Sequence, residues 1–254
     1  MNACKPLKSA RNILLAIYDY LVLYLGLAWL GLLCLGWTLI TIILYPLLPQ
    51  KYARRLGRFA IMTGFRIYLY CLALSRRCTF DLTALDTLRG EAPLIIAPNH
   101  PSLLDAVMII SRLPNVACVM KAELMSNLFL GAGSRLARYI GNAPVRRMVS
   151  LATENLQGGS HLLLFPEGTR TIGGAVNPIK GCVGLIAKQA GVPVQTILIE
   201  TNSAYLSKGW PLFRKPMMPI HYQVRLGRRF NPPQDGHRFI AELEEYFAQE
   251  LSPA

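Results

Sequence analysis

The chain has 254 residues, 52% of them hydrophobic, which is enough for one sizeable α/β domain with an apolar appendage. Its 27 basic and 14 acidic residues give a formal net charge of +13, so we expect an anionic partner, either a membrane surface or a phosphorylated ligand. The sequence has no zinc-finger spacing and no aromatic RNA-binding signature, which argues against nucleic acid. The six cysteines contain no C-x-x-C pair, which argues against a disulfide framework or a metal site.

The amino-terminal segment 13–48 is apolar, and Asp19 is its only charged residue. A membrane-spanning helix needs about 20 apolar residues, so the segment is long enough to span. The alternative is a hairpin in one leaflet, with Pro46 and Pro49 ending the first helix and segment 56–74 as the returning arm. We favour the hairpin, because a single span leaves one of two basic flanks on the wrong side of the membrane. These flanks contain Lys5, Lys8 and Arg11 before the segment, and Lys51, Arg54, Arg55 and Arg58 after it.

Downstream of Arg77, short apolar runs alternate with helical patterns. We therefore expect membrane-embedded helices over residues 1–75 and an α/β domain over 76–254, with a mixed sheet flanked by helices. In such sheets ligands gather at the carboxyl ends of the strands. The predicted strands are 94–97, 116–120, 161–165, 194–199 and 220–226. The predicted helices are 103–112, 128–140, 149–157, 182–190 and 238–251.

A histidine and an aspartate, separated by four residues, follow the first of these strands in the sequence PNHPSLLD. Pro101 and Ser102 are typical of a helix start, with serine as the cap, so Asp105 should lie in the first turn. Its carboxylate could then accept Nδ1–H of His100 and leave Nε2 as a base. The alternative is structural, with Asp105 complementing the helix dipole and His100 in a plain turn.

A second polar cluster follows the strand 161–165 in the sequence FPEGTR. We expect Glu167, Thr169 and Arg170 to lie at the same rim as His100, since both clusters come where a strand ends. The guanidinium of Arg170 offers a planar fork for a phosphate. A structural turn alone explains the proline and the glycine, but not the whole cluster.

The two motifs, in this order and about sixty residues apart, resemble the glycerolipid acyltransferases typified by 1-acyl-glycerol-3-phosphate (lysophosphatidate) acyltransferases. The resemblance covers roughly residues 90–200. It implies transfer of a fatty acyl group from acyl-CoA or acyl carrier protein to the hydroxyl of a lysophospholipid, with His100 as general base and Asp105 as its partner. It implies no resident cofactor or metal. The implied substrate-binding residues are Lys121, Arg147, Glu167, Gly168, Thr169 and Arg170.

Two departures from the family pattern leave the acceptor open. Arg146 stands where the family usually has an acid, and Thr196 stands where it usually has a second proline. The favoured acceptor is 1-acyl-glycerol-3-phosphate, which would give phosphatidic acid. The alternatives are another acceptor, such as a lyso-ornithine lipid, and an inactive lipid-binding protein. We expect a membrane location, the inner membrane if the protein is bacterial, with the catalytic domain on the cytoplasmic side.

Overall fold

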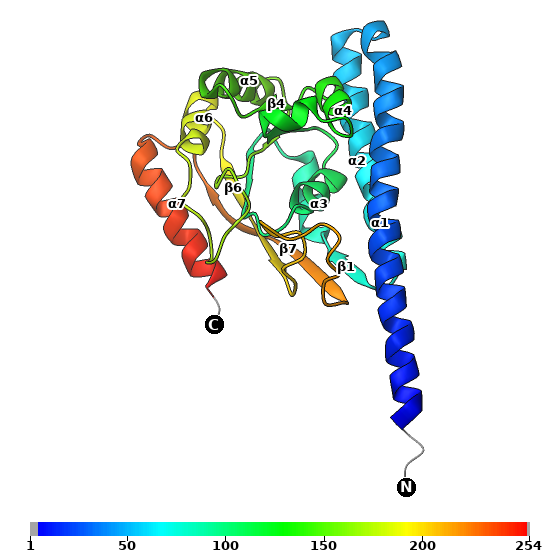
Figure 1. Cartoon of the computed structure of the whole chain (residues 1–254). Coiled ribbons are helices and arrows are strands. Elements are labelled where there is room, and N and C mark those ends of the chain that lie inside the picture. The colour runs from blue at the N-terminus through cyan, green and yellow to red at the C-terminus, as the bar shows by residue number, and fades with distance from the viewer. Residues whose placement is uncertain (1–4, 253–254) are drawn as a thin grey trace.

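A computed structural model describes residues 5–252, so Cys4 lies outside the described residues. Two long helices, α1 (Lys5–Leu47) and α2 (Gln50–Leu74), run antiparallel beside an α/β domain (Figure 1). Pro46 lies in the last turn of α1, and Pro49 is the N-cap residue of α2. Proline cannot continue the hydrogen-bonded ladder, and the chain reverses here as the sequence predicts.

The domain contains a seven-stranded sheet in the order β1-β7-β6-β2-β5-β3-β4. Its strands are parallel except at the β6–β7 pair, which is antiparallel, so the predicted mixed sheet is confirmed. The strands are β1 (Cys78–Asp81), β2 (Ile95–Pro98), β3 (Val116–Met120), β4 (Ile140–Gly141), β5 (His161–Leu163), β6 (Val194–Thr201) and β7 (Ile220–Phe230).

Helices cover both faces of the sheet, and each face has its own apolar core. On one face, side chains of α1, α2 and α3 pack against the strands, and on the other face those of α5, α6 and α7 do so. Because both faces of the central strands are buried, these strands appear in the sequence as continuous apolar runs. The remaining helices are α3 (Asp105–Arg112), α4 (Gly131–Leu136), α5 (Val145–Gln157), α6 (Cys182–Ala190) and α7 (Gly236–Leu251), with 3-10 turns η1 (Thr83–Gly90) and η2 (Ala122–Ser126).

The predicted helix over 128–140 is wrong in length. The structure has helix only over Gly131–Leu136, because Arg138 adopts a left-handed φ of 56° and the chain then enters β4. A left-handed residue ends a helix and redirects the chain. Strands β1 and β4 were not predicted, since β4 has only two residues and β1, with the sequence CTFD, lacks an apolar run.

Candidate active site

The residues singled out in the sequence come together at one edge of the sheet. Strands β2, β5, β3 and β4 are neighbours and parallel, so their carboxyl ends share that edge. His100 follows β2, and the turn with Arg170 follows β5. Lys121 follows β3, and Arg147 lies in the first turn of α5, just after β4. The topology therefore joins segments that are distant along the chain.

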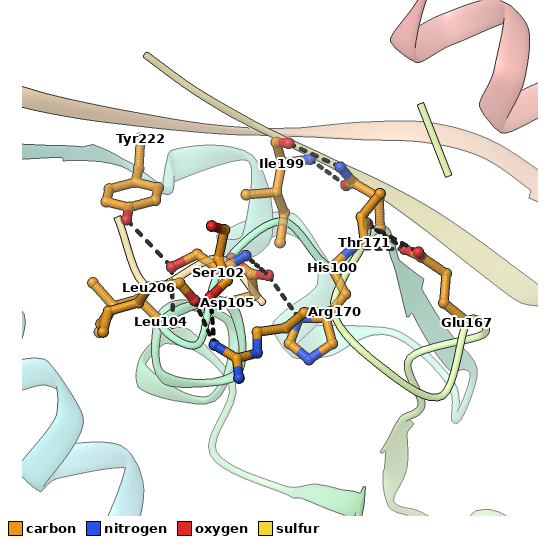
Figure 2. Close-up of polar contacts among 12 residues, drawn as sticks. His100, Ser102, Leu104, Asp105, Glu167, Arg170, Thr171, Ile199, Leu206 and Tyr222 are labelled. Carbon is orange, nitrogen blue, oxygen red and sulfur yellow. Dashed lines mark hydrogen bonds and ion pairs between the residues drawn. The ribbon is translucent and has the colours of Figure 1, made fainter. Parts of the chain in front are cut away.

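His100 and Asp105 form the predicted pair. Nδ1 of His100 lies 2.8 Å from Oδ2 of Asp105, the first residue of α3 (Figure 2). The same oxygen accepts the backbone N–H of Ser102 at 2.8 Å. The expected cap by Ser102 is wrong, because helix α3 starts three residues later and the Ser102 hydroxyl instead donates to the carbonyl of Tyr205 at 3.1 Å.

The environment of the pair fixes the imidazole. Asp105 is fully buried, and burial raises the pKa of its carboxyl to about 6, while the hydrogen bond from His100 opposes the rise. The ring of Phe165 stacks on the His100 ring, with centroids 3.8 Å apart. A carboxylate that accepts Nδ1–H leaves Nε2 unprotonated. The His100 side chain is 15% exposed, so the arrangement is suited to a general base at a protein surface edge.

Glu167 is buried and holds the turn that contains His100. Its Oε1 accepts the backbone N–H of His100 at 3.0 Å and the hydroxyl of Thr171 at 2.8 Å. Its Oε2 accepts the backbone N–H of Asn177 at 2.9 Å. Only 1% of Glu167 is exposed. These contacts show Glu167 holding the backbone of His100, and its predicted contact with substrate stays a prediction.

The other members of the FPEGTR turn lie nearer the surface. Gly168 has a φ of +69°, and a Cβ there would lie 2.8 Å from the side chain of Lys180, so both conformation and space favour glycine. Nη1 of Arg170 donates to the carbonyls of Leu206 at 2.8 Å and Ser207 at 2.9 Å. Arg170 and Thr169 are half-buried. Substrate contacts by Gly168, Thr169 and Arg170 remain predictions.

Comparisons with known proteins agree with this geometry. Residues 79–200 match the family model described as Acyltransferase. The chain is 24% identical over 215 residues to the 1-acyl-sn-glycerol-3-phosphate acyltransferase of Pseudomonas aeruginosa, covering 82% of this chain and 80% of that protein. It is 32% identical over 119 residues to the lyso-ornithine lipid O-acyltransferase of the same organism, covering 44% and 45% of the two chains.

A solved structure has the same fold. The crystal structure of the 1-acyl-sn-glycerophosphate (LPA) acyltransferase PlsC from Thermotoga maritima superposes with a TM-score of 0.65, covering 96% of this chain and 95% of that one at 20% identity. Residues 79–200 therefore form a domain of the Acyltransferase family, and these relatives support its glycerolipid branch. The matches to named acyltransferases support an O-acyltransferase.

Two contacts that hold the histidine turn were not found from the sequence. The side chain of Asn99 bonds both backbone groups of Ile199, donating at 3.0 Å and accepting at 2.7 Å, and so pins the start of the histidine turn to β6. The carbonyl of Leu206 accepts the backbone N–H of Leu103 at 3.1 Å. Asn99 stands within the motif, but nothing in the sequence indicated its partner a hundred residues away.

Proposed function

We propose that this protein moves a fatty acyl group from a thioester, acyl-CoA or acyl carrier protein, to the free hydroxyl of a lysophospholipid. The preferred acceptor is 1-acyl-glycerol-3-phosphate, and the product is phosphatidic acid. The observation that carries the proposal is the His100–Asp105 pair at the carboxyl edge of the parallel strands. The relative with the widest coverage quoted above is named for the same reaction.

In the proposed reaction, Nε2 of His100 accepts the proton of the acceptor hydroxyl as its oxygen attacks the thioester carbonyl. The new C–O bond forms, the C–S bond breaks, and the imidazolium returns the proton to the departing thiolate. Positioned proton transfer of this kind contributes on the order of 10²–10⁴ in rate. Asp105 keeps the imidazole oriented and stabilises its protonated form. A thiolate is a good leaving group, so the step requires neither a metal nor a covalent intermediate.

We place the acceptor's phosphate near the cations of the same edge, Lys121, Arg147 and Arg170. Lys121 and Arg147 are exposed, and the hydrogen bonds that the structure describes for the Arg170 guanidinium use only Nη1. Guanidinium groups bind phosphates through paired, charge-assisted hydrogen bonds. Arg170 would then have two tasks, holding the 206–207 segment and contacting the phosphate.

A second candidate acceptor is a lyso-ornithine lipid. Arg146, which replaces the acid expected in the family pattern, is exposed in the first turn of α5, beside Arg147. It could therefore change the charge that an acceptor meets. Thr196 is different: it is fully buried in β6 and donates to the carbonyl of Arg228 at 2.7 Å. Thr196 is therefore a buried strand residue, and this departure from the family pattern gives no information about the acceptor.

The test offers purified protein a panel of lysolipids with both thioesters and identifies products by mass spectrometry. Arg170→Lys keeps the charge and loses the planar fork. The kcat/KM for the acceptor should therefore fall by an amount equivalent to about 1.5–3 kcal/mol of transition-state free energy, with little change in the KM for the thioester. Arg135→Lys is the matched control, because Arg135 also donates to a backbone carbonyl, that of Met125 at 2.6 Å, outside the motifs. Acylation of a phosphate-free acceptor at the same rate, unaffected by Arg170→Lys, would put the second candidate first.

We also propose a membrane location, the inner membrane for a bacterial cell, with the domain on the cytoplasmic side. Of the described helices, α1 is the one that is long and apolar enough to cross a membrane, over Arg11–Leu47. Much of α1 lies against α2 and the domain. Leu23 packs in the apolar core, and further along the helix the hydroxyl of Thr38 donates to the carbonyl of Leu128. An upright span would therefore draw part of the domain into the bilayer. A hairpin lying along one leaflet avoids this conflict.

Helix α2 fits the returning arm of that hairpin. Two of its arginines face the domain, since Arg58 is buried and Arg66 donates to the carbonyl of Ser111 at 3.2 Å, whereas Arg55 in its first turns is exposed. Its other side exposes large apolar and aromatic side chains. These are Tyr52, Leu56, Phe59, Ile67, Tyr70 and Leu74.

A further inference from the structure

The connection between β6 and β7, residues 202–219, has an exposed apolar tip. This β6–β7 loop contains neither helix nor strand. At its tip Leu212, Phe213 and Met217 are 45%, 65% and 90% exposed. Isolated exposed apolar residues are common, but three on one short loop need a partner or a function.

The tip continues the apolar surface of α1. The ring of Phe213 lies 6.3 Å from the ring of Tyr24, which stacks on Tyr20 at 6.1 Å, and all three rings are exposed. Lys215 fastens the loop to the helix, with its Nζ 3.2 Å from the carboxylate of Asp19 and 5.5 Å from the centre of the Tyr20 ring. The candidate membrane helix and the loop thus share one exposed surface.

The charges around the tip match a lipid surface. Lys208 and Arg214 are exposed and are not paired with a carboxylate among the side chains that the structure describes. The guanidinium of Arg214 lies 5.0 Å from the Trp210 ring, and Trp210 Nε1 donates to the Arg214 carbonyl at 3.1 Å. Tryptophan and cations beside apolar side chains are typical of segments at the membrane–water interface.

The root of the same loop holds the catalytic turn. The carbonyl of Tyr205 accepts the hydroxyl of Ser102, and the carbonyl of Leu206 accepts both Leu103 N–H and Arg170 Nη1. Tyr205 and Leu206 are themselves buried. The contact of Leu206 with Arg170 is drawn in Figure 2, and the tip follows these root residues directly along the chain.

We propose that the tip of the β6–β7 loop, residues 212–217, is a second membrane-docking element, which inserts into the headgroup region of the bilayer beside α1. Docking sets the catalytic turn against the lipid surface from which the acceptor comes. The inference deepens the proposed function and rests on its membrane location, but not on the identity of the acceptor.

The first test locates the tip in the bilayer. Full-length Phe213→Trp protein is reconstituted in phosphatidylcholine–phosphatidylglycerol vesicles with or without brominated acyl chains, and its fluorescence is compared with that of the wild type. The emission added by Phe213→Trp should be quenched by the brominated lipid. Leu185→Trp is the control, since Leu185 is also exposed but lies in α6, on the other face of the sheet, and its added emission should not be quenched. Equal emission with and without bromine for Phe213→Trp overturns the proposal, and this readout needs no enzymatic activity.

The second test connects the tip to catalysis. The double variant Phe213→Ser and Met217→Ser should raise KM for a vesicle-borne, long-chain lysophosphatidate by about tenfold or more, since burial of each such side chain is worth about that factor. It should leave the rate on a water-soluble, short-chain lysophosphatidate unchanged, as should Leu185→Ser on both substrates. An equal loss of activity on both acceptors would show that the loop only supports the structure of the site. No loss of activity on either acceptor would show that the tip has no role in catalysis. Either result contradicts docking.

Discussion

Asp105 combines complete burial with an ionisable carboxyl, and its Oδ1 has no hydrogen-bond partner in the structure. A buried carboxylate stabilises the imidazolium that forms beside it, but it costs folding free energy because it has left water. We therefore expect the ionised Asp105 carboxylate to favour catalysis and to lower the folding stability, and this loss of stability should depend on pH.

Asp105→Asn should lower the transfer rate by about 10³-fold or more, since an amide that donates to Nδ1 leaves Nε2 protonated. The same change should favour the fold. The folded pKa of Asp105, raised to about 6, lies above the unfolded value near 4, so wild-type stability falls as pH rises between them. The Tm of Asp105→Asn minus that of the wild type should thus increase from pH 4 to pH 6 and then level off, with exposed Asp81→Asn as control for removal of an acid. A pH-independent difference would refute the raised pKa.

Glu167 gives a second test at the residue scale. Glu167→Gln keeps the size but replaces one carboxylate oxygen by an amide NH₂, so one of the two backbone N–H donors, that of His100 or that of Asn177, loses its acceptor. We expect a loss of about 2–3 kcal/mol in folding stability and a parallel loss of kcat, because the turn that contains His100 is held less firmly. Thermal melts and steady-state kinetics measure both, and exposed Glu154→Gln is the control. Unchanged stability with a selective rise in the KM for the acceptor would instead support the predicted contact of Glu167 with substrate.

The sequence reveals His100 and Asp105 because their contact is local, across one tight turn, and is encoded by spacing. The contact of Glu167 with His100 spans 67 residues and that of Asn99 with Ile199 spans 100, and no spacing rule reaches that far. Ser102 shows a related limit. It has the residue type of a helix cap, and its Oγ accepts the backbone N–H of Leu104 at 3.3 Å, but α3 begins only at Asp105, so the cap position falls on Leu104.

At the scale of elements, helix α2 joins the apolar hairpin to the enzyme domain through Arg58. This side chain is 2% exposed and donates to Ala137 O at 3.1 Å, Asn115 Oδ1 at 2.8 Å, Ser160 Oγ at 2.7 Å and Asn155 Oδ1 at 2.7 Å. Arg58→Met should destabilise the protein by about 3 kcal/mol or more, since several buried acceptors lose their donor. Exposed Arg55→Met on the same helix should have little effect. Equal Tm values for the two variants would show that the network contributes nothing to stability.

The elements that the sequence predicts well are those with a strong local pattern. The segments 116–120 and 182–190 match β3 and α6 in full, because turn residues bound their apolar runs. Strand β7 extends to Phe230, past the predicted end at 226, because pairing with β6 continues where the apolar pattern has faded. Ladder hydrogen bonds with a neighbouring strand cannot be read from one segment alone.

At the scale of the whole molecule, the fold separates its tasks by position. The parallel strands gather the reactive residues at one edge, and the two-helix hairpin lies along one side of the domain (Figure 1). Asp19, the lone acid of the apolar segment, is ion-paired with Arg77 at 2.6 Å and with Lys215, so the hairpin meets the domain without an uncompensated charge. The sequence predicted the apolar segment and the mixed sheet, but the side-by-side packing of hairpin and domain depends on these long-range pairs.

The central claim is that His100 is the base of an acyl transfer. The most direct measurement is the initial rate at which purified, vesicle-reconstituted protein converts lysophosphatidate and acyl thioester to phosphatidic acid, for the wild type, His100→Ala and His221→Ala. His221 is an exposed histidine whose Nδ1 contacts the hydroxyl of Thr79 at 2.7 Å, on a different strand pair. The account predicts a fall of about 10²-fold or more for His100→Ala, at unchanged Tm, and wild-type activity for His221→Ala. A His100→Ala protein that retains more than roughly a tenth of the wild-type rate would contradict it.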